Sequence, residues 1–118
     1  MMEEEIVSYD TAVMSKERGF NTYTTYWYSV KDRTPTLDGD RMFALEYLQA
    51  PTQSLLQRWL REERFLLVYC IPNESVAGMW HYKVEETWTP NEDLSEHYAT
   101  YEQALEKGLM EALKIIKL

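Results

Sequence analysis

Few residues of this chain have the types and spacing that catalysis requires. The chain contains two histidines, His81 and His97, and a single cysteine, Cys70. A zinc site needs three or four clustered ligands, and a cysteine nucleophile needs a cationic or basic neighbour that favours its thiolate. No such motif surrounds these three residues. We therefore expect Cys70, which lies in an apolar run, to be a small buried side chain. We predict no catalytic residue, no metal ligand and no cofactor.

Carboxylates and glycines give no stronger catalytic signal. Paired carboxylates can cleave glycosidic bonds, but a chain with 20 acidic residues contains pairs such as Glu85-Glu86 by chance. The four glycines are scattered and form no phosphate-binding loop. Asp38 and Asp40 flank Gly39, yet an EF-hand needs more ligands at fixed spacing and a closing glutamate. We do not expect calcium binding there.

The acidic residues are concentrated in one part of the chain. Seven of them, with no lysine or arginine, lie between Glu85 and Glu106, and the net charge is −8. One interpretation is a solvated surface that keeps the protein soluble. The other is a docking surface for a basic protein partner. The candidate partner-binding residues are Glu85, Glu92, Asp93 and Glu96.

Charge and composition also exclude some functions. A net charge of −8 disfavours direct binding to nucleic acid, which needs clustered lysine and arginine. No stretch approaches the 18 or so apolar residues of a membrane span, and the start Met1–Glu5 is acidic, unlike a signal peptide. A single cysteine cannot form an internal disulfide. We therefore predict a cytoplasmic protein that does not contact membranes.

Three helices are predicted from their start signals and apolar stripes. Ser8 caps the first, which should end near Arg18 before Gly19. Thr52 caps the second, and Thr100 begins a third that continues to Leu118. Gly108 interrupts the apolar stripe of the third helix, which indicates close packing against a sheet.

Strands are predicted between these helices. Residues 23–30 are almost all aromatic or β-branched. Residues 65–71 are apolar on both faces, which is typical of a central strand, and residues 79–88 alternate as in a half-exposed hairpin partner. Residues 31–40 are expected to form a loop, and residues 41–49 fit a strand and a helix equally well.

These elements predict one α+β domain over residues 1–118. The predicted order is α-β-α-β-β-α, in which residues 41–49 are not assigned to an element. The architecture that buries every stripe is a small, mainly antiparallel sheet of three strands, or four with residues 41–49, packed with three helices. Strand order and oligomeric state stay open.

Several stretches resemble a family of small uncharacterised proteins that phages and mobile elements of gut bacteria encode. The resemblance covers most of the chain except about residues 32–46. Its motifs are an APT…WLRE segment, a YxTYEEALExGLxEAL ending and a matching first helix, at residues 47–52 with 59–62, residues 98–113, and residues 8–20. The family has no assigned activity, so the resemblance implies a genomic context and no chemistry.

The leading functional hypothesis is a small acidic accessory factor of a phage or mobile element that binds proteins. A DNA mimic is a variant of it that needs regularly spaced carboxylates. The alternative is a small-ligand binder or enzyme with an aromatic-lined pocket. Its candidate lining residues are Trp27, Tyr28, Trp80, Tyr82 and Trp88. A third hypothesis is self-association through an exposed edge at residues 23–30.

Overall fold

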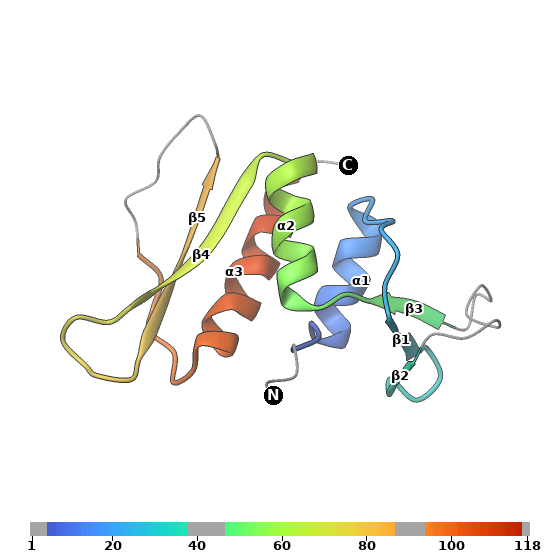
Figure 1. Cartoon of the computed structure of the whole chain (residues 1–118), viewed down its shortest axis with the longest axis horizontal. Coiled ribbons are helices and arrows are strands. Elements are labelled where there is room, and N and C mark those ends of the chain that lie inside the picture. Colours follow the sequence, from blue (N-terminus) through green and yellow to red (C-terminus); the bar gives the residue numbers. More distant parts are fainter. Residues whose placement is uncertain (1–4, 38–46, 87–93, 117–118) are drawn as a thin grey trace.

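The computed structural model describes residues 5–37, 47–86 and 94–116 as three helices and five strands (Figure 1). The predicted α+β class, the three helices, the antiparallel pairing and the order of helices and strands are confirmed. Among the described residues, no helix has the length and apolar character needed to cross a bilayer. The elements are α1 (Tyr9–Glu17), β1 (Tyr26–Ser29), β2 (Pro35–Leu37), β3 (Tyr47–Ala50), α2 (Gln53–Glu63), β4 (Leu66–Pro72), β5 (Trp80–Glu86) and α3 (Tyr101–Ile115).

The three helices begin at the residues that the sequence indicates. The hydroxyls of Ser8, Thr52 and Thr100 each accept a hydrogen bond from the backbone N–H three residues later. These bonds satisfy one of the donors that the first turn of a helix leaves free. Gly19 has φ +96° directly after the C-cap of α1, a conformation that glycine adopts without steric cost.

The strands form two separate antiparallel sheets. β1 lies between β2 and β3 in one sheet, and β4 pairs with β5 in the other. Figure 1 shows the helices between the two sheets, with α1 beside the first and α3 beside the second. Residues 31–40, expected as a loop, contribute β2, and the end of the ambiguous segment 41–49 belongs to β3. Residues 38–46, with the candidate calcium loop at 38–40, lie outside the described residues.

β4 is not the central strand that its sequence predicts. It has one strand neighbour, β5, in a two-stranded sheet. On its other edge the side chain of Gln57 in α2 donates to the carbonyl of Val68 at 2.5 Å, so a helix takes the place of a further strand. Leu66 and Val68 are buried, whereas Leu67 and Tyr69 on the opposite face are half-buried. The prediction that residues 65–71 form a central strand covered on both faces is therefore wrong, because only one face of β4 is buried.

The three helices run in the same direction. Ser8, at the start of α1, donates its N–H to Glu106 of α3, while Arg18 after the end of α1 donates to the carbonyl of Leu113 near the end of α3. Gln53, at the start of α2, donates to the carbonyl of Glu102 in the first turn of α3. All three positive helix ends therefore meet at one end of the molecule.

The core lies between the helices and on the faces that the sheets turn toward them. Its largest fully buried side chains are leucines of α2 and α3. α1 instead buries Thr11, Ala12 and Ser15, which are small side chains. Small side chains let α1 lie close to α3, which brings the start of α1 against Glu106.

Candidate functional site

The four acidic residues selected from the sequence do not share one described surface. The Glu85 carboxylate accepts a hydrogen bond from the Tyr69 hydroxyl at 2.7 Å and lies 3.7 Å from the Lys83 ammonium. Its side chain is only 16% exposed. Glu96 is exposed in the segment that follows. Glu92 and Asp93 lie outside the described residues. The partner-binding role of these four residues stays a prediction.

The two histidines come together although 16 positions separate them. Their ring centroids are 6.2 Å apart, and Nδ1 of His81 lies 2.8 Å from the carbonyl oxygen of Ser95. Ser95 also accepts a hydrogen bond from the backbone N–H of Tyr82 through its hydroxyl. These bonds hold the segment after residue 93 against the edge of β5. Within the described ranges, no group of three histidine, cysteine or carboxylate side chains could hold a metal ion.

Cys70 lies half-buried on β4, near the start of α3. Burial, followed by the nearby charge of Glu102, raises the pKa of its thiol to about 11. The thiol is therefore neutral at physiological pH, which is the opposite of what a nucleophile needs.

The aromatic residues proposed as one pocket lining are divided between the two sheets. Trp27 and Tyr28 belong to β1, and Trp80 and Tyr82 belong to β5. Trp88 lies outside the described residues. The β5 rings pack locally, Trp80 edge-on to Tyr101 and Tyr82 stacked on Tyr98. Of the four described rings, only Tyr28 lines the groove at the starts of the three helices.

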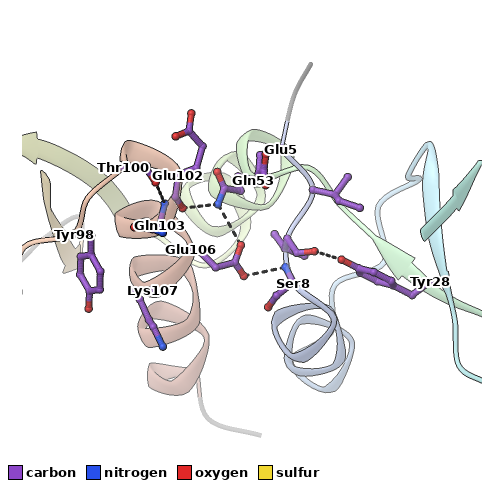
Figure 2. Close-up of a pocket in the computed structure, with 12 residues that line it drawn as sticks. Glu5, Ser8, Tyr28, Gln53, Tyr98, Thr100, Glu102, Gln103, Glu106 and Lys107 are labelled. Atoms are coloured by element: carbon purple, nitrogen blue, oxygen red, sulfur yellow. Dashed lines mark hydrogen bonds between the residues drawn. The ribbon is translucent and has the colours of Figure 1, made fainter. Parts of the chain in front are cut away.

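That groove, of about 900 Å³, lies where the three helix starts meet (Figure 2). It takes residues from the segment before α1, from β1, from the start of α2 and from the first two turns of α3. The lining residues are Glu5, Ile6, Val7, Ser8, Tyr28, Gln53, Tyr98, Thr100, Glu102, Gln103, Glu106 and Lys107.

Glu106 joins the helices at the base of the groove. Its carboxylate accepts hydrogen bonds from the Ser8 N–H at 3.0 Å, from the Thr11 hydroxyl, and from the Gln53 amide at 3.2 Å. A carboxylate is favoured at positive helix ends, and here one carboxylate lies close to the starts of α1 and α2. Glu106 is therefore already occupied by the fold, and we assign it a structural role.

The rim of the groove carries carboxylates that the fold does not occupy. Glu5 is exposed and Glu102 is half-buried. Neither carboxylate forms a hydrogen bond or ion pair with another described residue. Figure 2 shows the Glu102 carboxylate and the Lys107 ammonium pointing in opposite directions from α3. Lys107, the only cationic side chain among the described lining residues, therefore points away from this part of the rim.

Two tyrosines contribute to the apolar part of the wall, beside the aliphatic side chains of the segment before α1. The Tyr28 hydroxyl donates to the carbonyl of Val7 at 2.5 Å. Burial, followed by the charges of Glu106 and Glu5, raises its pKa. Burial and then the charge of Glu96 raise the pKa of Tyr98. Glu96, one of the candidates from the sequence, stands two positions before Tyr98 in the chain.

Sequence reasoning missed Glu5 and treated Glu102 and Glu106 only as members of the acidic segment. Glu106 stands on the polar side of a predicted helix, where it resembles any solvated carboxylate. Its partner Ser8 is 98 positions away. The sequence did mark two helix starts through their capping residues, Ser8 and Thr52. Two positive helix ends that lie side by side favour a carboxylate between them, which is the position that Glu106 takes.

Comparison with protein-family models, with curated proteins and with solved structures finds no match to this chain.

Proposed function

We propose that the chain is a protein-binding accessory factor that takes a basic segment of its partner into the groove at the helix starts. The observation that carries this proposal is the pair of carboxylates on the groove rim, Glu5 and Glu102, which have no described cationic partner. Glu106 and Gln53 hold the floor in place by hydrogen bonds, so the rim rests on a fixed base. A site of this kind needs no rearrangement before it binds.

The chemistry of the walls favours a peptide with both charge and apolar surface. Lysine and arginine carry an apolar stem below a charged head, and the groove offers the rings of Tyr28 and Tyr98 together with the rim carboxylates. Its volume of about 900 Å³ is enough for several side chains. Glu96 near Tyr98 extends the negative potential toward the candidate acidic segment. Long-range attraction from a chain of net charge −8 adds to the rate of encounter.

A small cationic ligand in the same groove is the second candidate function. The same carboxylates and tyrosines favour it, because aromatic faces and carboxylates both attract cations. The two candidate ligands differ in size. A small cation, unlike a peptide, gains nothing from contacts beyond the groove. The phage or mobile-element origin and the cytoplasmic location are parts of the proposal that rest on the resemblance and on composition.

The test is binding of a fluorescein-labelled hexalysine peptide, followed by fluorescence anisotropy at low and high salt. The variant is E5Q/E102Q, and the matched control is E63Q/E74Q, which removes the same charge at two exposed positions outside the groove. Exposed charge pairs contribute about 0.2–1 kcal/mol each, so two pairs contribute about 0.4–2 kcal/mol. We therefore expect E5Q/E102Q to weaken binding by about 2- to 30-fold more than the control.

Each outcome bears on the proposal directly. Equal weakening in both variants would mean that only net charge attracts the peptide, and the groove would be excluded as the site. Amide shifts of the peptide complex confined to Ser8, Tyr98 and the first turn of α3 would support it. Spermine binding as tightly as hexalysine, with the same dependence on Glu5 and Glu102, would favour the small-ligand function instead.

A further inference from the structure

A second groove lies on the other side of the start of α2. Its volume is about 500 Å³, and it separates the segment before β1 from the exposed side of α2. Arg58 and Arg61 lie in its wall, together with serine, threonine and tyrosine hydroxyls, and none of the described residues that line it is acidic. The described lining of this groove is therefore locally basic in a chain whose net charge is −8. The charged side chains among the described lining residues are both arginines, and a guanidinium group donates hydrogen bonds but does not accept them.

We propose that this groove binds a short, extended, acidic segment of a partner protein. Its lining runs along α2 from Ser54 to Arg61, which corresponds to about 10 Å at the rise of an α-helix. Three residues of an extended chain cover about the same length. The site therefore matches a short peptide segment better than a single ion.

The two arginines can accept such a ligand. Arg61 is exposed and forms no hydrogen bond or ion pair with another described residue. Arg58 contacts Glu62 through Nε at 3.3 Å, with both side chains more than half exposed. Exposed pairs of this kind are weak, and the contact leaves the terminal nitrogens of Arg58 for a carboxylate. Guanidinium groups bind carboxylates through two parallel hydrogen bonds, which gives the arginines selectivity for acidic side chains.

An apolar side chain in the ligand would find contacts beside the arginines. The ring of Tyr23 is 70% exposed, and Leu55 in the same wall is half-buried. Exposed aromatic rings beside arginines are typical of the residues that contribute most to protein interfaces. We therefore expect glutamate or aspartate flanking one apolar residue in the bound segment.

Nucleic acid and a second copy of the chain are the competing occupants. A phosphate backbone would meet two arginines and a net charge of −8 over the rest of the chain, which opposes binding of a long polyanion. A second copy would bring its own acidic residues. Both are therefore included as outcomes of the test.

The experiment measures anisotropy of a labelled six-residue peptide that contains four glutamates and two leucines. The variant is R58Q/R61Q, and the matched control is K16Q/K114Q, which removes the same charge at exposed positions outside the groove. A thymidine oligonucleotide of similar charge is the second probe, and sedimentation of each variant reports self-association. Because all four side chains are exposed, both variants should fold, and circular dichroism checks this.

The expected result is at least fivefold weaker peptide binding by R58Q/R61Q and less than a twofold change in K16Q/K114Q. Four results would overturn the proposal. The peptide could fail to bind, or both variants could weaken it equally. The oligonucleotide could bind more tightly than the peptide in an arginine-dependent way, or the chain could self-associate in a way that R58Q/R61Q abolishes. The outcome is independent of the hexalysine experiment, because the two grooves share no lining residue.

Discussion

Replacement of Gly108 by alanine tests how closely α3 lies on the second sheet. A Cβ atom at this position would lie 2.8 Å from Cγ1 of Val68 and 3.1 Å from Cβ of Tyr82. These atoms belong to β4 and β5, and Val68 is buried. Neither is the end of a flexible side chain, so the helix or the sheet has to move to admit a methyl group.

Two effects of opposite sign set the magnitude. Alanine is favoured over glycine inside a helix by about 1 kcal/mol. Overpacking a well-filled core costs about 1–3 kcal/mol. Because the contacts at Gly108 involve two strands at once, we place the cost in the upper half of that range. We expect Gly108→Ala to lower the free energy of unfolding by about 1–2 kcal/mol, despite its better helix propensity.

Urea denaturation followed by circular dichroism measures this change. Val68→Ala removes the nearest methyl group, so the double variant completes a thermodynamic cycle. We expect Gly108→Ala to be less harmful in the Val68→Ala background, with a coupling of about 1 kcal/mol. The packing explanation would be refuted by a Gly108→Ala protein that is more stable than the native chain, or by a cycle with no coupling.

Three other predictions concern single residues. Glu106→Gln should lower the free energy of unfolding by about 2 kcal/mol, because it removes the charge that three donors share. Calorimetry of this variant beside Glu111→Gln, a half-exposed site on the same helix, measures the difference. Phe65→Gly should raise the free energy of unfolding, measured by urea denaturation, by about 0.5–1 kcal/mol, because Phe65 has φ +58° and is 54% exposed. The Cys70 thiol, with its pKa raised from 9.0 to about 11, should react with a disulfide reagent at pH 8 about 100-fold more slowly than in urea. Since the unfolded thiol loses its proton first, the contribution of Cys70 to stability is present below pH 9 and falls as pH rises toward 11. A thiol that reacts equally fast in the folded and unfolded chain would contradict this prediction.

The sequence by itself determined the parts of the fold that depend on neighbouring residues. The caps at Ser8, Thr52 and Thr100 each join a side chain to a backbone N–H only three residues away. The hairpin of β4 and β5 pairs segments that are close along the chain. Gly108 was expected to allow close packing, and its contacts with Val68 and Tyr82 confirm this. Local hydrogen bonds and apolar periodicity are enough for such predictions.

Only the tertiary structure decided how these parts meet. Apolar strands do not specify whether they join one sheet or two, and here the edge of β4 is covered by Gln57 of a helix. The parallel direction of the helices brings Glu5 and Glu102 to one groove, and packing of the segment before β1 beside α2 forms the other groove around Arg58 and Arg61. The contact between Ser8 and Glu106 spans 98 positions. No local pattern encodes a contact at that separation, because it forms only when burial of three separate apolar stripes places the helix starts side by side.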